Sequence, residues 1–334
     1  MKQLSIIIPI YNVEKYVRTC LESVFRQGLD EECFEVIIVN DGTKDNSMGA
    51  IADILEQHQN IIVIEQANQG LSVARNNGIA KATGEYLLMP DSDDLLVDNS
   101  VKPLLEKALE TKADMVIADY RQLSDEEIEV LSASPSPSQQ EPTFTEASGT
   151  DFLSAPFCRY YWRSLYRKAF LTNNNIAFIP GIYAQDVPFT DECFLKANKV
   201  LRTTAQLIIY RRGHASASIS YSMKRAHDTT IAISRLMELT ELSSLSSPVR
   251  DKNKNLAFSL LYEHICAITY GHLRNFSEVV QAFDFLKEQI PKLPFKADRR
   301  QVVWSFLYNH LPTRLFALVP YTIQSIKKKL HKAT

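Results

Sequence analysis

The sequence predicts an α/β fold with a mostly parallel central sheet, followed by an α-helical C-terminal region. Short apolar segments of strand character alternate, up to about Tyr120, with segments whose apolar residues recur every three or four positions. Strands that alternate with helices in this way form parallel sheets with helices on both faces. From about Ala226 onward only the helical spacing remains.

The first strand is expected at Leu4–Ile10. Its β-branched residues are continuous rather than alternating with polar ones, which indicates a strand buried on both faces of the sheet. The helix after it carries apolar residues from Val13 to Phe25 and ends near Gly28. Further strands are expected at Phe34–Val39, at Ile61–Ile64, from Gly84 and at Met115–Tyr120, with helices around Ile51–Leu55, Val73–Ala80 and Val101–Thr111. Such a layer is of the nucleotide-binding type.

Three carboxylates, Asp91, Asp93 and Asp94, stand where the apolar run after Gly84 stops. Adjacent carboxylates repel, and the repulsion is relieved if they share a hard cation or if they cap the next helix. Both interpretations remain open from these residues alone. The position favours a ligand site, because open α/β sheets bind ligands at the carboxyl ends of their strands.

The other strand ends carry carboxylates and amides rather than phosphate-binding loops. Neither Gly-x-Gly-x-x-Gly nor Gly-x-x-x-x-Gly-Lys-Ser/Thr occurs there, which argues against dinucleotide enzymes and P-loop NTPases. The polar residues at the strand ends are Asn12, Asp41, Asp45, Asn68, Asp91 and Asp93. An acidic rim binds a phosphorylated ligand only if a cation bridges the charges, so the layout predicts a metal-nucleotide ligand.

The bulk composition excludes several classes of protein. The chain has 334 residues, of which 45% are hydrophobic and 23% charged, as in globular proteins. A net charge of -2 argues against a general nucleic-acid binder. Five scattered cysteines without metal spacing favour a reduced, cytosolic setting. We expect neither a secreted nor an integral membrane protein, since no signal core and no apolar run of bilayer length is found.

Four segments together resemble the family 2 glycosyltransferases of bacterial type, which have the GT-A fold. They are Ser5–Asn12 (SIIIPIYN), Val39–Ser47 (VNDGTKDNS), Asn68–Gly78 (NQGLSVARNNG) and Gly84–Asp94 (GEYLLMPDSDD). The resemblance implies an inverting transfer of a sugar from a nucleoside diphosphate, expected to be UDP, with Mn²⁺ or Mg²⁺ as cofactor. The acceptor would be a saccharide or a lipid-linked hydroxyl in the synthesis of cell-surface polysaccharide, and no nucleic-acid partner is expected.

The resemblance also implies roles for single residues of the first half. The nucleotide-sugar contacts would be Pro9 and Tyr11 in the base pocket, Asp41 accepting a hydrogen bond from the base, Asn68, Arg75 beside the base or diphosphate, and Asp91 near the ribose; Asp93 would hold the metal. Each has a structural alternative: Pro9 ends a strand, Asp41-Gly42 forms a turn, and Arg75 is a solvated helix residue.

Two segments of the second half complete the implied site. Asp186 falls where the family has the second residue of a Glu-Asp pair, which implies the general base; the chain departs from the pattern with Gln185. Asp186 as an ordinary helix cap is the alternative. His214 is the candidate for a further metal ligand, against a solvated histidine, and Arg211 or Arg212 could meet the diphosphate.

The expected domain organisation has four parts. Residues 1–123 form the nucleotide-sugar-binding half, 124–150 a flexible polar insertion, 151–225 the acceptor-binding half and 226–334 a helical region. The insertion is predicted from the polar, proline-bearing tract Ser132–Pro142. The aromatic and basic run Phe157–Leu171 is expected to pack in the core, with its arginines reaching solvent.

The C-terminus combines apolar and basic residues. An aromatic stretch from Trp304 to Val319 precedes Ile323, Ile326 and Leu330, which stand at helical spacing beside Lys327, Lys328, Lys329 and Lys332. This pattern suits a helix in the interface of an anionic membrane, and equally a packed helix with a solvated basic tail. The expected location is the cytoplasm, at the inner face of the plasma membrane if the tail binds lipid.

Two other functions remain open from the sequence. Gln185 supports a nucleotide-sugar-binding module without turnover, and the metal-nucleotide pattern also suits a metal-dependent nucleotidyltransferase. The three differ in product, because a glycosyltransferase releases nucleoside diphosphate, a nucleotidyltransferase releases pyrophosphate and a binding module releases neither.

Overall fold

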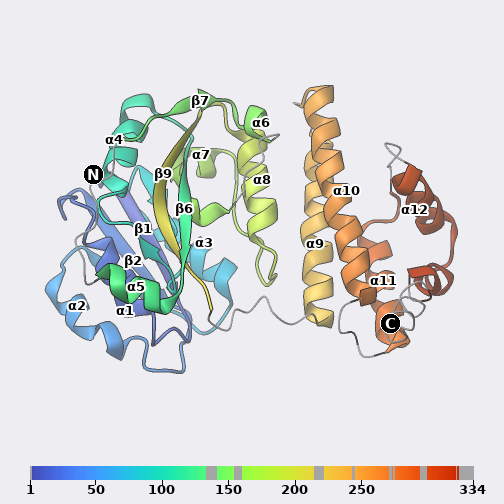
Figure 1. The fold of residues 1–334 in the computed structure, drawn as a ribbon, viewed down its shortest axis with the longest axis horizontal. Coiled ribbons are helices and arrows are strands. Elements are labelled where there is room, and N and C mark those ends of the chain that lie inside the picture. Colours follow the sequence, from blue (N-terminus) through green and yellow to red (C-terminus); the bar gives the residue numbers. More distant parts are fainter. Residues whose placement is uncertain are drawn as a thin grey trace. The chain divides into compact units, whose positions relative to one another are not determined.

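The computed structural model describes residues 2–132, 141–153, 160–213, 222–242, 245–270, 273, 275–293, 299–320 and 322. The chain divides into two compact units. The first, called the α/β unit, comprises Met1–Gly181 and Phe189–His214; the second, called the helical unit, comprises Ile182–Pro188 and Ala215–Thr334. Figure 1 labels those helices and strands of the two units for which there is room.

The α/β unit is built on one sheet, which in the described residues has nine strands. They are β1 (Leu4–Ile10), β2 (Phe34–Asn40), β3 (Ile61–Glu65), β4 (Tyr86–Leu88), β5 (Leu95–Leu96), β6 (Met115–Leu123), β7 (Thr145–Ala147), β8 (Ser164–Arg167) and β9 (Val200–Arg211). Their order is β3-β2-β1-β4-β8-β6-β9-β5, and β7 pairs with β9. The first four strands are parallel, and β8 lies antiparallel between β4 and β6. The predicted α/β fold is confirmed.

Strands β1 and β2 form the centre of the core. Every residue of both is buried, and Leu4 pairs with Phe34 at one end of the register and Ile10 with Asn40 at the other. The helices of this half are α1 (Val17–Val24), α2 (Ala52–Gln57), α3 (Leu71–Lys81) and α4 (Val101–Thr111). Gly78 of α3 lies so close to the sheet that a Cβ there would stand 2.3 Å from Ile7 Cγ2. The predicted β-branched strand is therefore buried on both faces, as expected.

The segment 124–150 contains more regular structure than its polar composition indicates. Helix α5 (Asp125–Ser132) and strand β7 lie within it, and residues 133–140 lie outside the described residues. Ile128 of α5 is 4% exposed and packs in a small cluster with Leu95, Val97 and Ile209. Leu131 of the same helix also packs against this cluster, so the helix is held by few apolar residues and the composition of the segment did not indicate it.

The run that contains Tyr161, Trp162 and Arg163 is buried, as the sequence predicted, but one detail was wrong. In the described part of the predicted run, residues 160–171, the short helix η2 (Tyr161–Arg163) is followed by β8 and by the start of α7 (Lys168–Asn173). Arg163 does not reach solvent, since it is 2% exposed and pairs with Asp119. The other two described helices of the stretch between β6 and β9 are α6 (Gly149–Phe152) and α8 (Asp186–Lys196).

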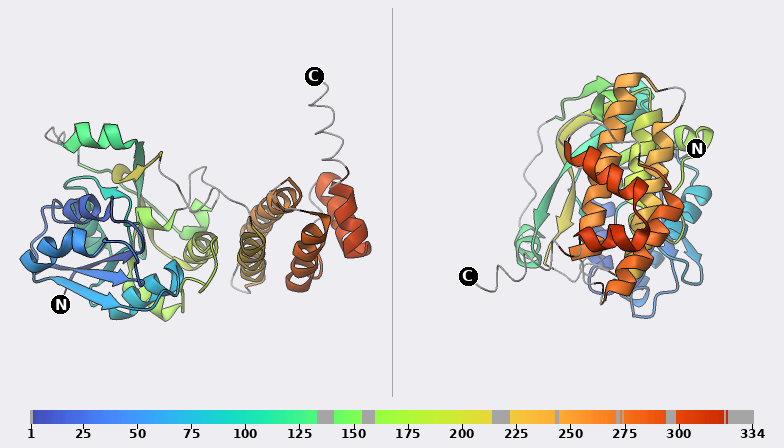
Figure 2. Two further views of the ribbon diagram at one scale, coloured as in Figure 1. Left: turned by 90° about the horizontal axis from the view of Figure 1, so that it is seen from below. Right: turned by 90° about the vertical axis from the view of Figure 1, so that its right-hand side faces the viewer.

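The helical unit has a core of its own. Its helices are α9 (Met223–Thr240), α10 (Ser247–Tyr270), α11 (Phe276–Gln289) and α12 (Arg299–His310), and α9 and α10 lie side by side (Figures 1 and 2). Buried members of the core include Ile233, Leu261, Ile265, Phe283, Leu286 and Tyr308. Pro248 lies in the first turn of α10, where proline is tolerated. Among the described helices, none has the length and apolarity needed to cross a membrane.

Candidate functional site

The acidic cluster lies where the sequence predicted it, directly after β4. Asp91, Asp93 and Asp94 each offer a carboxylate oxygen, and these oxygens all lie within 4.8 Å of one another. Asp94 is buried at 1% exposure, whereas Asp91 and Asp93 are partly exposed. The end of β4 therefore presents three converging carboxylates rather than a row of solvated side chains.

Asp94 is the member of the cluster that sequence reasoning left without a role. Its Oδ1 accepts a hydrogen bond of 2.9 Å from the Arg211 backbone N–H, while its Oδ2 is buried and has no partner among the described residues. Burial, together with the nearby Asp91 and Asp93 carboxylates, raises the pKa of Asp94 to about 9. A buried carboxylate oxygen without a donor, beside two further carboxylates, fits a hard divalent cation.

Two residues of other segments contact the carboxylate of Asp91. Its Oδ1 accepts a hydrogen bond of 2.5 Å from Tyr161 Oη and pairs with Arg75. Arg75 is fully buried in α3, with its guanidinium 4.1 Å from the centre of the Tyr161 ring and 5.3 Å from that of Phe178. The alternative of a solvated Arg75 is therefore wrong. A direct contact of Arg75 with base or diphosphate stays a prediction.

Asp41 joins the ends of two neighbouring strands. It is 3% exposed, and its two carboxylate oxygens accept hydrogen bonds from the backbone N–H groups of Gln69 and Gly70 at 2.8 and 2.9 Å. Gly42, with φ of +64°, comes so close that a Cβ there would lie 2.9 Å from the backbone nitrogen of Asn68. The structure thus brings Asp41 and the exposed Asn68 loop together at one edge of the sheet.

Pro9 and Tyr11 stand at the end of the central strand. Pro9 lies inside β1 and is buried, whereas the sequence allowed it to end the strand; Tyr11 follows the strand and is 40% exposed. Next to them, burial raises the pKa of Asp45, but hydrogen bonds from Ser47, the Glu14 N–H and Thr43 outweigh this effect and lower the pKa to about 2. Asp45 therefore organises the loop after β2 as an ionised acceptor.

Arg211 supports the acidic cluster from β9. It is 5% exposed, donates from Nε to the Asp93 backbone oxygen at 2.9 Å and pairs with Asp125 of α5. Arg211 thus lies against the acidic loop, and Arg212 pairs with Glu127 at 3.2 Å. A contact of either residue with the diphosphate stays a prediction. His214 lies outside the described residues.

Asp186 is the first residue of α8 and is partly buried. The preceding Gln185 is 5% exposed. A carboxylate in the first turn of a helix is favoured by the positive end of the helix dipole, so the position suits an ordinary helix terminus as well as a chemical role.

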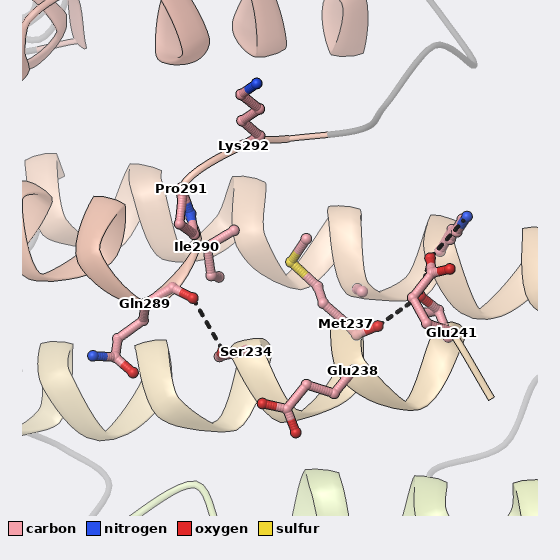
Figure 3. Close-up of a pocket in the computed structure, with 11 residues that line it drawn as sticks. Ser234, Met237, Glu238, Glu241, Gln289, Ile290, Pro291 and Lys292 are labelled. Atoms are coloured by element: carbon pink, nitrogen blue, oxygen red, sulfur yellow. Dashed lines mark hydrogen bonds and ion pairs between the residues drawn. The ribbon is translucent and has the colours of Figure 1, made fainter.

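A separate pocket of about 290 Å³ lies in the helical unit (Figure 3). It is lined by residues of α9 and α10 and by Gln289–Lys292, and Ser234 Oγ donates to the Gln289 backbone oxygen at 3.3 Å. Lys254 and Glu241, which are 3.1 Å apart, form an ion pair at its edge. None of the predicted site residues lines this pocket.

Comparison with known proteins identifies one family. A family model described as glycosyl transferase family 2 matches residues 5–171. The uncharacterized glycosyltransferase EpsJ of Bacillus subtilis (strain 168) is 36% identical over 62% of this chain and 60% of its own length. The poly(ribitol-phosphate) beta-glucosyltransferase of Bacillus spizizenii is 24% identical over 94% of this chain and 48% of its own length. The chain thus spans less than two thirds of both relatives.

The fold is also similar to a solved structure, that of S. aureus TarS 1–349 in complex with UDP-GlcNAc. The two share a TM-score of 0.72 and 19% sequence identity, over 99% of this chain and 92% of that one. At this identity the likeness concerns the fold, and it extends over both units.

Proposed function

The chain belongs to glycosyl transferase family 2, and from this premise we propose that it transfers a sugar from a UDP-linked donor to a hydroxyl group of a cell-surface glycan, with inversion at the anomeric carbon. The observation that carries the proposal is the convergence of Asp91, Asp93 and Asp94 at the end of β4. Support for the donor comes from TarS, whose structure contains UDP-GlcNAc, and for the acceptor from the relative named for poly(ribitol phosphate).

The donor would lie along the edge of the sheet where the strand ends meet. Pro9, Tyr11, Asp41 and Asn68 would form the side of the site that receives the base. Asp91 would bind the ribose through its carboxylate, which Arg75 and Tyr161 hold in place. Since the acidic edge would repel a diphosphate, the site needs a cation.

Asp93 and Asp94 are the residues that would hold Mn²⁺ or Mg²⁺, with Asp91 beside them. The unpaired, buried Oδ2 of Asp94 is the feature of this chain that fits such an ion. When bound, the ion would neutralise the charge of the leaving diphosphate. His214 is retained as a further candidate ligand from the sequence.

Asp186 would be the general base. At neutral pH an aspartate is ionised, so it can accept the proton of the acceptor hydroxyl while that oxygen attacks the anomeric carbon. Gln185, where the family has glutamate, cannot take over this role because a neutral amide does not accept a proton.

We also propose a peripheral contact with the cytoplasmic face of the membrane. Among the described apolar residues of the C-terminal helices, Val303, Phe306, Leu315 and Leu318 are 55%, 60%, 50% and 43% exposed. The sequence adds a lysine cluster shortly after them. Exposed apolar residues next to lysines suit an anionic lipid surface, and a lipid-linked acceptor would then be within reach.

The experiment that tests the function is a product analysis. The full chain is incubated with Mn²⁺ and with UDP-GlcNAc, UDP-glucose or UDP-galactose, with and without poly(ribitol phosphate). Release of UDP with formation of a glycosylated acceptor supports the proposal. In a parallel incubation with UTP and a sugar 1-phosphate, release of pyrophosphate would show a nucleotidyltransferase. Binding without product would show the inactive module that Gln185 favours.

A further inference from the structure

A buried carboxylate of the helical unit binds the segment that precedes Asp186. Asp228 of α9 is 5% exposed, and its Oδ2 accepts a hydrogen bond of 3.1 Å from the backbone N–H of Tyr183. The same oxygen accepts from Lys224 Nζ at 2.7 Å. Tyr183 stands three residues before Asp186, and the whole stretch Ile182–Pro188 belongs to the helical unit.

The backbone contact holds this segment at Tyr183, next to the buried Ile182 and two residues before the buried Gln185, which are 7% and 5% exposed. The Tyr183 ring is 55% exposed, with Lys224 Nζ 4.8 Å from its centre, so packing of the ring does not fix the chain. On the N-terminal side, Gly181 has φ of +77° and open space around it. A hydrogen bond to a carboxylate is stronger than one between neutral groups, and the same carboxylate also pairs with Lys224 at 2.7 Å.

We propose that Asp228 is a positioning residue for the transfer reaction: by holding the Tyr183 backbone it sets where the Asp186 carboxylate stands when the acceptor hydroxyl loses its proton. The proposal rests on the proposed role of Asp186 as base. Asp228 and the segment Ile182–Pro188 belong to the same unit, so this contact lies within the helical unit. A general base must lie within hydrogen-bond reach of the proton that it accepts. A small displacement of this segment is therefore expected to lower the rate of transfer.

The contact itself can be tested without substrate. Hydrogen–deuterium exchange is measured on peptides covering residues 182–188 in the parent and in Asp228→Ala, Asp228→Asn and Asp114→Ala. We expect exchange in this segment to become about tenfold faster in Asp228→Ala and to change little in Asp228→Asn, whose amide oxygen still accepts. Asp114→Ala is the matched control, since Asp114 is also buried, accepts backbone N–H groups from Asn198 and Lys199, and pairs with Arg167. Unchanged exchange in Asp228→Ala would overturn the proposal.

A double-mutant cycle tests whether the contact acts through Asp186. UDP release from UDP-GlcNAc and from UDP-glucose with Mn²⁺ is measured for Asp228→Ala, Asp186→Asn and the double variant, with water as acceptor if no saccharide is used. We expect Asp228→Ala to lower kcat about tenfold or more with an unchanged donor KM, and Asp228→Asn to restore most of it. In the double variant, kcat should be no lower than in Asp186→Asn alone.

The outcomes separate the two proposals. If Asp186→Asn alone keeps its turnover, the base assignment fails and the positioning role fails with it. If Asp186→Asn loses turnover but Asp228→Ala lowers kcat by the same factor in the Asp186→Asn background as in the parent, the assignment of Asp186 as base is kept. The positioning role of Asp228 is then overturned. A fall in kcat for Asp114→Ala as large as that for Asp228→Ala would also overturn it, because the effect would then be one of general stability.

Discussion

Tyr161 and Asp91, 70 positions apart in the sequence, are joined by a hydrogen bond of 2.5 Å between the phenol Oη and the carboxylate Oδ1. Arg75 donates to the same carboxylate oxygen. Two donors on one oxygen, one of them the buried Arg75 guanidinium, restrict the rotation of the Asp91 carboxylate. If Asp91 binds the ribose as proposed, its carboxylate is oriented by these two contacts rather than by the ligand.

Removing the Tyr161 hydroxyl should weaken nucleotide binding. Tyr161→Phe keeps the ring over Arg75 but loses the hydrogen bond to Asp91, so we expect the affinity for UDP with Mn²⁺ to fall about tenfold by isothermal titration calorimetry. Tyr86→Phe is the matched control: Tyr86 is equally buried, and its Oη lies 2.8 Å from the carbonyl oxygens of Ala108 and Ala113, away from Asp91. Equal affinities in both variants would show that the hydroxyl of Tyr161 only contributes to packing.

Asp93→Asn should remove most of the divalent-cation dependence of nucleotide binding. The amide has nearly the size of the carboxylate but lacks its charge, and hard cations prefer charged oxygen ligands. UDP affinity is measured with increasing Mn²⁺ in the parent, in Asp93→Asn and in Asp98→Asn, a nearby aspartate that pairs with Arg26. Should Asp93→Asn respond to Mn²⁺ as the parent does, the metal is bound elsewhere.

The helical unit should lose stability as the pH falls below the ordinary histidine range. His264 is 2% exposed, its Nε2 lies 2.9 Å from Thr230 Oγ1, and burial lowers its pKa to about 3. Below about pH 6.5, the unfolded chain therefore binds a proton at His264 that the folded unit does not bind. The free energy of unfolding is therefore expected to decrease by up to about 1.4 kcal/mol per pH unit from pH 6.5 down to about 3.

This pH dependence can be measured by urea unfolding. The fluorescence of Trp304, which lies in the helical unit, reports on it selectively when Trp162 is replaced by Phe. His264→Gln cannot gain a proton in this range, so its stability should change less with pH than that of the parent. An identical slope in the two proteins would show that another group causes the loss.

The exposed apolar residues of the C-terminal helices should determine membrane binding. Full chain, Phe306→Ser/Leu315→Ser and a truncation after Val319 are sedimented with vesicles of neutral lipid and with vesicles containing anionic lipid. We expect the full chain to sediment with anionic vesicles at low salt and both variants to do so less. The location at the membrane is contradicted if all three proteins stay in the supernatant.

The parts of the fold that the sequence predicted well are those with a local signal. The β-branched residues of Leu4–Ile10 indicate burial on both faces, and the aspartates after β4 indicate the acidic cluster, because both patterns are contained in consecutive residues. No local pattern connects Asp91 with Tyr161, or Tyr183 with Asp228, which is 45 positions away. These pairs exist because η2 and α9 are brought to their partners by the fold.

Arg163 and Arg211 show the same limit for charged residues. Arginine in an aromatic or strand segment is expected to reach solvent, yet both are buried because Asp119 and Asp125 pair with them. Their partners lie 44 and 86 positions away, so only the tertiary structure reveals the compensation.

Nuclear magnetic resonance of the transfer reaction tests the central claim most directly. An α-linked UDP-sugar that supports turnover is followed with the parent and with Asp186→Asn at saturating donor. We expect UDP and a β-linked product with the parent, and a rate reduced about 100-fold or more in Asp186→Asn, which should still bind UDP. An α-linked product, or near-parental turnover in Asp186→Asn, would contradict an inverting transfer with Asp186 as the base.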